Sequence, residues 1–230
     1  MFDLFKIVHD NWPLFLIGQY PHGPLGGLAS TLILAASALV LAFPLGLLLA
    51  LARVSPWRWL RYPATVWVYV LRGIPLLMVI FWTYFLVPLL IGHNITGFTT
   101  MLCTLVVYQS AYLGEIIRGG IQALPGGQYE GARALGLGYV RSLRYVVLPQ
   151  GVRNCLPSLI NHSVLLFKNT SLAMAIGVVE LTYATREVEN YTFRTFESYL
   201  VATVVYLAFS LMLMGAGALV ARHFSKALAR

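Results

Sequence analysis

The sequence predicts an all-helical integral membrane protein with five transmembrane helices, and three observations support this fold class. Of the 230 residues, 59% are hydrophobic and only 10% are charged. The mean hydropathy is +0.76, and a water-soluble fold could not bury so much apolar surface. The apolar residues also gather in long runs that are almost free of charge, each able to cross a hydrocarbon core about 30 Å thick. This composition excludes disordered, fibrous and disulfide-stapled classes.

Five segments account for the predicted transmembrane helices. They are residues 28–51, 62–91, 95–114, 154–179 and 198–221. Two of them carry a cation in their interior, Arg72 in the second and Lys168 in the fourth. We expect one transmembrane domain over residues 26–222, with a short cytoplasmic tail over 223–230. Residues 1–25 lack the basic start and small-residue cleavage site of a signal peptide, so we expect an interfacial segment there.

The distribution of charge predicts the orientation in the membrane. Arginines and lysines concentrate after the first, third and fifth predicted spans, whereas acidic residues dominate the connection before the fifth span. Because basic connections stay in the cytoplasm, the N-terminus should lie outside and the C-terminus in the cytoplasm. The basic connections on the cytoplasmic side thus account for the net charge of +8, and no nucleic-acid partner is needed to explain it.

The sequence contains no recognisable catalytic or metal-binding motif. Cys103 and Cys155 form no C-x-x-C pair, and His162 has no acidic companion at metal-binding spacing. A phosphate-binding P-loop needs Gly-Lys-Ser/Thr, and none of the lysines follows a glycine. We therefore expect no catalytic residue, no metal and no cofactor bound by this chain.

The connection between the third and fourth spans is long and predicts two short helices. The expected order is a turn at 125–127, a helix over 128–135, a bend at Gly136 and Gly138, and a helix over 140–147 that ends ahead of Pro149. Glu130 lies early in the first helix, where an acidic residue suits the positive end of the helix dipole. The alternative is an ordinary basic loop that packs against the chain's own spans.

This segment resembles the E-A-A signature of ABC importer permeases. Glu130-Gly131-Ala132 is followed by Gly136 and then by Val146-Val147-Leu148-Pro149, at the spacing of the family. Gly131 stands where the family usually has Ala, which costs about 1 kcal/mol of helix propensity. The resemblance implies that residues 125–150 form the coupling segment that docks on an ATPase subunit. Its site residues would be Glu130, Gly131, Ala132, Arg133, Gly136, Leu148 and Pro149.

Three further segments resemble the polar amino acid uptake branch of that family, namely 72–76, 112–121 and 168–172. The resemblance implies a type I ABC importer permease in the bacterial inner membrane. It also implies an ATPase dimer that holds ATP and magnesium, a periplasmic amino acid-binding protein, and a second permease subunit, identical or homologous. The chain itself would then be a transport subunit and not an enzyme.

Charges inside a membrane usually face a cavity or a partner, so Arg72, Glu115, Arg118 and Lys168 are candidates for the substrate path. Gly73 and Pro75 predict a helix break next to Arg72, because proline lacks a backbone donor. A half-helix starting there would direct its positive end toward an anionic substrate group. The alternative is that Arg72 only binds carbonyls freed at the break.

The other candidates also have alternative interpretations. Lys168 is followed by the polar residues Asn169, Thr170 and Ser171, yet it could simply stabilise a helix end. Glu115 and Arg118 share a helix face and could pair with each other, or Glu115 could meet a substrate ammonium. Arg118 could also extend its charged end to the membrane surface.

The excess of intramembrane cations favours an acidic or neutral amino acid as substrate. Residues 76–88 look closest to permeases for glutamate and aspartate. Glutamine, histidine and basic amino acids remain alternatives within the same class. From other classes, the alternatives are a passive channel and a membrane-embedded enzyme that uses Arg72, Glu115 and Arg118 on lipid phosphates.

Overall fold

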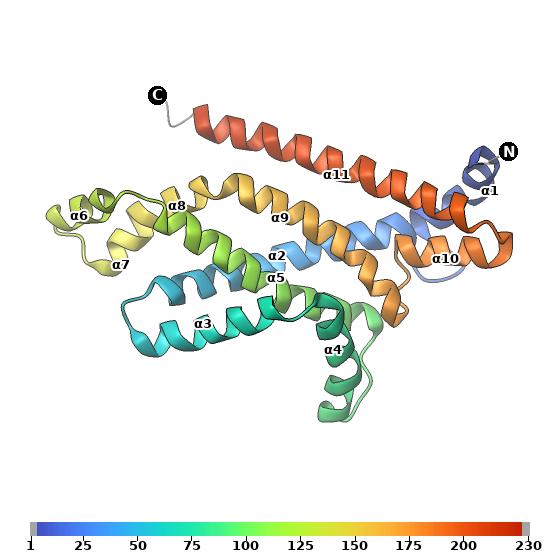
Figure 1. Ribbon diagram of the computed structural model, residues 1–230, viewed down its shortest axis with the longest axis horizontal. Helices are drawn as coiled ribbons and strands as arrows, with labels where there is room; N and C mark the ends of the chain where they lie inside the picture. The colour runs from blue at the N-terminus through green and yellow to red at the C-terminus, as the bar shows by residue number, and fades with distance from the viewer. Residues whose placement is uncertain (1–3, 227–230) are drawn as a thin grey trace. The chain divides into compact units, whose positions relative to one another are not determined.

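Helices form nearly all of the regular structure in the described part of the chain, which confirms the predicted fold class (Figure 1). The computed structural model describes the backbone of residues 4–226 and the side chains of residues 4–221. An isolated β-bridge joins Gly18 and Leu25. The helices are α1 (Leu4–Ile17), α2 (Gly27–Val54), α3 (Arg58–Gly73), α4 (Leu76–Ile91), α5 (Gly97–Gln122), α6 (Gly126–Ala134), α7 (Tyr139–Ser142), the π-helix η1 (Leu143–Val147), α8 (Leu148–Asn154), α9 (Leu156–Asn169), the 3-10 helix η2 (Thr170–Ile176), α10 (Leu181–Thr192) and α11 (Thr195–Lys226).

Three of the described helices, α2, α5 and α11, are each long and apolar enough to cross a membrane. Two bent helix pairs raise the number to five if each pair counts as one span. These pairs are α3 with α4, and α9 and η2 with α10. The predicted five spans fall on these elements.

Large apolar side chains on the outside of the helices agree with lipid as the surrounding solvent. In α11, Leu207 is 57% exposed and Met212 is 64% exposed, and Leu89 of α4 is 80% exposed. In water such exposed apolar surface would be costly, whereas hydrocarbon solvates it. The outward faces of these helices are therefore suited to contact with acyl chains.

The chain divides into two compact units. The first comprises the described residues of 1–40, 75–106 and 164–213, and the second comprises those of 41–74, 107–163 and 214–230. Helices α2, α5, α9 and α11 each contribute one part to each unit.

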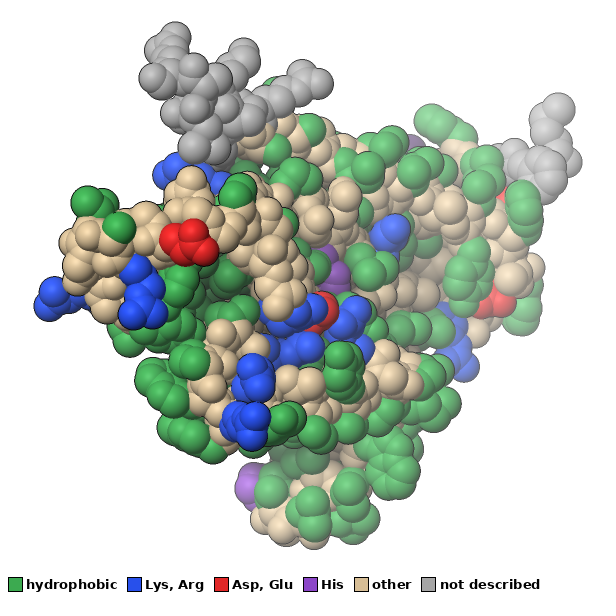
Figure 2. Space-filling view, turned by 60° about the vertical axis from the view of Figure 1, so that its left-hand side comes forward, with side chains coloured by type: hydrophobic (Ala, Val, Ile, Leu, Met, Phe, Trp, Pro, Cys, Tyr) green, Lys and Arg blue, Asp and Glu red, His purple; other side chains and the backbone are tan. Residues whose placement is uncertain are grey.

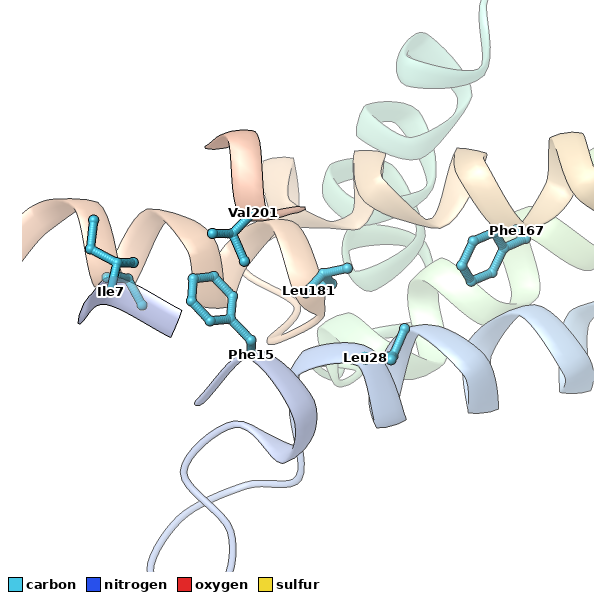
Figure 3. Close-up of a cluster of buried hydrophobic side chains, with 7 residues drawn as sticks. Ile7, Phe15, Leu28, Phe167, Leu181 and Val201 are labelled. Carbon is cyan, nitrogen blue, oxygen red and sulfur yellow. The ribbon is translucent and has the colours of Figure 1, made fainter. Parts of the chain in front are cut away.

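The core of the first unit collects apolar side chains from α1, α2, α9, α10 and α11 (Figure 3). Its buried members are Ile7, Phe15, Leu28, Phe167, Leu181, Val188 and Val201. Helix α10 was missed by the sequence analysis, which left residues 180–197 as a charged connection. The helix forms because its buried face, which includes Leu181, Ala184 and Val188, packs in this core.

The second unit contains a close approach of α2 and α5. A Cβ atom on Gly46 would lie 3.0 Å from the carbonyl oxygen of Ser110, and one on Gly114 would lie 3.0 Å from the carbonyl oxygen of Gly46. Larger residues at both positions would force the two backbones apart. This approach aligns the C-terminal ends of the two helices, where the candidate site lies.

The segment after α5 differs in two details from the prediction. Helix α6 begins at Gly126 and not at residue 128, because Pro125 already occupies the cap position. The second helix does not end ahead of Pro149, so that prediction was wrong. A π-helical turn, η1, leads directly into α8, and Pro149 lies in the first turn of α8, where no intrahelical donor is required.

Candidate functional site

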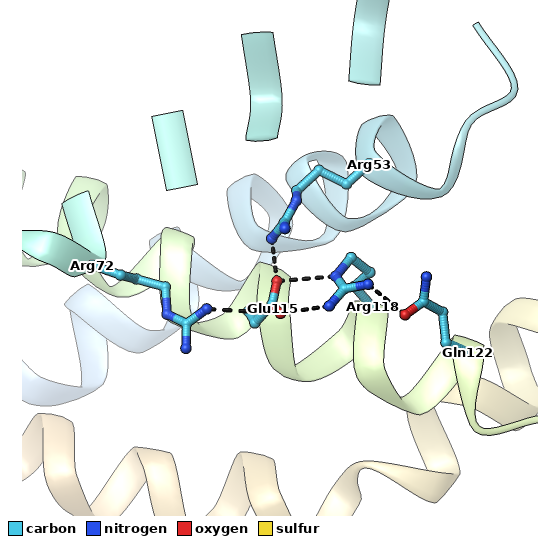
Figure 4. A network of polar contacts seen from close by, with 5 residues as sticks. All are labelled: Arg53, Arg72, Glu115, Arg118 and Gln122. Atoms are coloured by element: carbon cyan, nitrogen blue, oxygen red, sulfur yellow. Dashed lines mark hydrogen bonds and ion pairs between the residues drawn. The ribbon is translucent and has the colours of Figure 1, made fainter. Parts of the chain in front are cut away.

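The carboxylate of Glu115 is shared by three arginines from three helices of the second unit (Figure 4). Arg118 donates from Nε to Oε2 at 3.0 Å and from Nη2 to Oε1 at 2.6 Å. Arg53 donates from Nη1 to Oε2, and Arg72 Nη1 lies 3.7 Å from Oε1. Three positive charges thus surround one negative charge inside an apolar helix bundle.

Each helix positions its side chain for a local reason. Glu115 and Arg118 are three residues apart on α5, so they share a helix face and form a fork-shaped double hydrogen bond. Arg53 lies two turns beyond Gly46, whose close packing on α5 brings the end of α2 within reach of Glu115. Arg72 is in the last turn of α3, directly before the break that the sequence predicted.

Arg53 is the functional candidate that sequence reasoning missed. It was counted among the charges of the connection between the first two spans, yet it is only 7% exposed. Nothing in its immediate sequence distinguishes it from Arg58 or Arg61. A signal was available only in Gly46, because a glycine in an apolar helix interior often marks close helix packing.

Arg72 also begins a series of ring contacts within the second unit. Its guanidinium lies 5.3 Å from the centre of the Tyr112 ring, and that ring stacks on His162 at 5.5 Å. The His162 Nε2 atom lies 2.8 Å from Oε1 of Gln109. The buried histidine is thus satisfied by a neutral amide, which fits a structural role in the core.

The helix break at residues 73–75 is stabilised from α5. Helix α3 ends at Gly73 and α4 begins at Leu76 with Pro75 as its cap. The hydroxyl of Tyr108 donates to the carbonyl of Ile74 at 3.2 Å. Among the described contacts, Arg72 approaches Glu115 and Tyr112 and none joins it to the carbonyls freed at the break. Its place on the substrate path stays a prediction.

Lys168 and the residues that follow it belong to the first unit. Lys168 is exposed in the last turn of α9, where a cation also suits the negative end of the helix dipole. The hydroxyl of Thr170 is buried and donates to the carbonyl of Phe167, and Ser171 donates to the carbonyl of Lys168. These two hydroxyls satisfy carbonyl groups at the point where α9 gives way to the 3-10 helix η2. Asn169 is the last residue of α9.

The residues of the E-A-A resemblance lie on α6, in the turn that follows it and at the start of α8. Glu130, Gly131, Arg133, Gly136 and Pro149 are exposed, Leu148 is half-buried and Ala132 is buried. Gly136 has a φ of +78° and closes a Schellman motif, in which Leu137 N–H donates to the Ala132 carbonyl and Gly136 N–H donates to the Arg133 carbonyl. The glycine turn expected from the sequence is therefore present.

Neighbouring aromatic residues attach this segment to α2 within the second unit. The ring of Tyr139 packs edge-on against Trp57, and its hydroxyl lies 3.4 Å from the carbonyl of Val54. Burial raises the pKa of the Tyr139 hydroxyl above its ordinary value, so this group stays protonated. Within the described residues, no group of three or more His, Cys, Asp or Glu side chains is placed to hold a metal ion.

Comparison with known proteins assigns the chain to a family. Residues 42–226 match the model of the binding-protein-dependent transport system inner membrane component. The inner membrane amino-acid ABC transporter permease protein YhdY of Escherichia coli (strain K12) is 37% identical over 80% of this chain and 52% of its own length. The chain thus spans about half the length of that relative.

A second relative and a solved structure agree over a larger share of their lengths. The probable glutamine ABC transporter permease protein GlnM of Bacillus subtilis (strain 168) is 31% identical over 90% of this chain and 92% of its own length. The crystal structure of an amino acid ABC transporter with histidines has a TM-score of 0.85 and 32% identity, and the alignment covers 97% of this chain and 99% of that chain. This chain therefore belongs to the family of inner membrane components of binding-protein-dependent transport systems.

Proposed function

We propose that this chain is the permease subunit of an ABC importer that moves polar amino acids, with glutamate or aspartate as the preferred substrate. The observation that supports import of an amino acid is the agreement in fold, over 97% of the chain, with an amino acid ABC transporter. Transport would proceed by alternating access, in which the substrate passes charged groups inside the bundle. Arg72, Glu115, Arg118 and Lys168, with Asn169, Thr170 and Ser171, remain the proposed substrate path.

The proposed assembly places the N-terminus in the periplasm and the C-terminus in the cytoplasm of a bacterium. A periplasmic binding protein would deliver the amino acid, and a second permease subunit, identical or homologous, would complete the path. An ATPase dimer would hold ATP and magnesium and bind the coupling segment, residues 125–150. The exposure of Glu130, Arg133 and Gly136 supports a docking role for this segment.

The preference for an acidic substrate rests on charge. Glu115 has one negative charge for the three arginines that contact it, so the surrounding bundle keeps an excess of positive charge. An anionic amino acid would reduce the cost of these desolvated cations, whereas a basic amino acid would add to it. The names of relatives include glutamine and histidine, so these amino acids are the alternatives to test.

The test is uptake of radiolabelled amino acids into proteoliposomes that contain this chain, its co-purified partner subunits and internal ATP. We expect ATP-dependent uptake of glutamate or aspartate, which unlabelled glutamine, histidine and arginine inhibit less strongly than unlabelled glutamate. Dominant uptake of arginine or histidine would contradict the substrate preference. Uptake that does not depend on internal ATP would contradict the importer proposal.

The coupling role of the segment is tested by Gly136→Leu. A leucine at a φ of +78° is strained by about 1–2 kcal/mol and would open the Schellman turn between α6 and α7. We expect uptake to fall at least tenfold while the protein stays in the membrane. Gly138→Ala is the matched control, because Gly138 has a φ of −68° that alanine adopts freely. Equal uptake by the two variants would contradict the role of the turn.

A further inference from the structure

The second unit contains a cavity of about 650 Å³ next to the Glu115 network, a volume in the usual range of small-molecule sites. Its walls come from the end of α2, from α3, from the end of α5 and from the segment that follows it. Among the described residues, three arginines line it, Arg53, Arg61 and Arg118, and no acidic residue does. Figure 2 shows Lys and Arg side chains gathered on the face turned toward the viewer.

The described acidic side chains do not balance the charge around this cavity. Arg53 and Arg118 both bind Glu115, which Arg72 also approaches, so these four residues together keep a surplus of two positive charges. Arg61 adds another, because it has no acidic partner among the side chains of residues 4–221 and only stands over the Tyr62 ring at 5.7 Å. Both oxygens of Glu115 are already occupied, so its carboxylate cannot neutralise Arg61 as well.

One donor in the wall lacks a partner. The Nε atom of Arg53 is buried and has no hydrogen bond within the described structure, although the residue is only 7% exposed. A buried donor left without an acceptor costs about 1–3 kcal/mol, and more when it carries charge. Glu115 therefore satisfies the guanidinium of Arg53 only in part, which adds to the unbalanced positive charge at this wall.

The remaining walls suit a ligand with an apolar part. The rings of Tyr62, Tyr69 and Tyr129 line the cavity, together with apolar side chains such as Ile121 and Leu143. Tyrosines offer hydroxyl donors to an anion and apolar faces to its body. Arginine in turn binds carboxylates and phosphates with a fork of N–H donors.

We propose that this cavity is a binding site for a small organic anion, in which a carboxylate or phosphate group lies between Arg53, Arg61 and Arg118. Two sources supply this chemistry, namely the headgroup of an anionic phospholipid and a free carboxylate or phosphate such as an amino acid at the inner end of the path. The site does not depend on the transport proposal, because it rests on the charges and the cavity of this chain.

The test is isothermal titration calorimetry on the full-length chain, purified with its partner subunits in uncharged detergent. The probes are dihexanoyl-phosphatidylglycerol, the zwitterionic dihexanoyl-phosphatidylcholine, inorganic phosphate and glutamate. Arg61→Gln removes a cation of the cavity without touching the contacts of Glu115. Arg58→Gln is the matched control, because Arg58 lies one turn earlier on the same helix and does not line the cavity.

We expect saturable binding of at least one anionic probe, weakened about tenfold or more in Arg61→Gln and unchanged in Arg58→Gln. Arg53→Lys keeps the charge but removes the fork of guanidinium donors, and it should also weaken binding. Binding of phosphatidylglycerol and not phosphatidylcholine would identify a lipid headgroup, whereas binding of phosphate or glutamate would identify a free anion. No saturable anion binding, or equal losses in Arg61→Gln and Arg58→Gln, would overturn the proposal.

Discussion

Glu115 in the second unit is half-buried and Glu180 in the first unit is buried, and the protein stabilises the two carboxylates in opposite ways. Glu115 is surrounded by guanidinium groups from three different helices. Glu180 is fully buried and has no cation within ion-pairing distance among the described residues. Its carboxylate accepts the backbone N–H groups of Thr182 and Tyr183 at 3.0 and 2.9 Å and the Tyr206 hydroxyl at 2.8 Å.

The partners of Glu180 lie mainly in its own helix, whereas the partners of Glu115 are distributed over several helices. Glu180 caps α10, so its main partners follow it directly in sequence and move with it. The partners of Glu115 come from α2, α3 and α5, so any relative movement of these helices changes its contacts. The Glu115 network can therefore respond to rearrangement of the helices, whereas the Glu180 cap maintains the fold of its own unit.

The largest effect is expected from Glu115→Gln, which removes the only described acidic group within ion-pairing distance of Arg53, Arg72 and Arg118. Removing the acidic partner of a half-buried cluster, in which Arg53 is buried, should lower the free energy of unfolding by about 2–3 kcal/mol, at or below the low end for a fully buried ion pair. The measurement is chemical or thermal unfolding in detergent. Glu130→Gln is the charge-matched control on exposed α6, for which we expect a change within about 0.5 kcal/mol. A loss no greater than that of the control would show that the arginines do not depend on Glu115.

The next largest effect is expected from Glu180→Ala, at about 2 kcal/mol, because it removes the cap of α10 and one of the two hydrogen-bond partners of the Tyr206 hydroxyl. Glu180→Gln should cost only about half as much, since an amide oxygen can still accept from the backbone. At Glu115 the same conservative change should be the costly one. If Glu180→Gln and Glu180→Ala destabilise equally, the cap model of Glu180 is wrong.

The sequence predicts contacts between residues that are close in the chain, and it does not predict contacts that depend on the packing of distant helices. The pair of Glu115 and Arg118 could be anticipated, because residues three apart on a helix share a face. The break between α3 and α4 could be anticipated from Pro75. Arg53 could not, because 62 positions separate it from Glu115 and only the folded packing of α2 on α5 brings them together.

The two incorrect expectations have a similar origin. The charges of 180–197 suggested a connection, but a helix needs only one apolar face, and α10 buries that face in the core of the first unit. Pro149 suggested a helix end, but the π-helical turn η1 changes the hydrogen-bonding register and carries the chain into α8. The residue pattern of one segment does not predict how other helices pack against it, or the hydrogen-bonding register that the preceding turn sets.

A smaller effect is expected when the packing that delivers Arg53 to Glu115 is disturbed. In Gly46→Ala the new Cβ atom would lie 2.8 Å from the Cβ atom of Leu113, so α2 and α5 must separate slightly. We expect a loss of about 1.5 kcal/mol. Gly215→Ala is the control, because that glycine lies in α11 with open space around it, and alanine there should be neutral or slightly stabilising.

The same substitution also tests the dependence of the network on helix spacing. If Gly46→Ala moves Arg53 away from Glu115, its cost should shrink in a Glu115→Gln background, because the contact is already lost there. Strictly additive losses would show that the glycine serves packing alone. The contact between Arg53 and Glu115 would then not depend on the spacing of α2 and α5.

The smallest effect is expected at the helix break, from Tyr108→Phe. In a continuous helix the N–H of Met78 would bond the carbonyl of Ile74, but here it bonds Pro75, and the Tyr108 hydroxyl takes its place at 3.2 Å. Because Ile74 is 36% exposed, its carbonyl is not strictly confined to this donor, so the loss should be only about 0.5–1 kcal/mol. Tyr84→Phe, whose hydroxyl has no hydrogen bond among the described residues, should change nothing measurable. A loss at Tyr108 above that at Glu180 would mean that the break, and not the two carboxylates, dominates the polar energetics of the bundle.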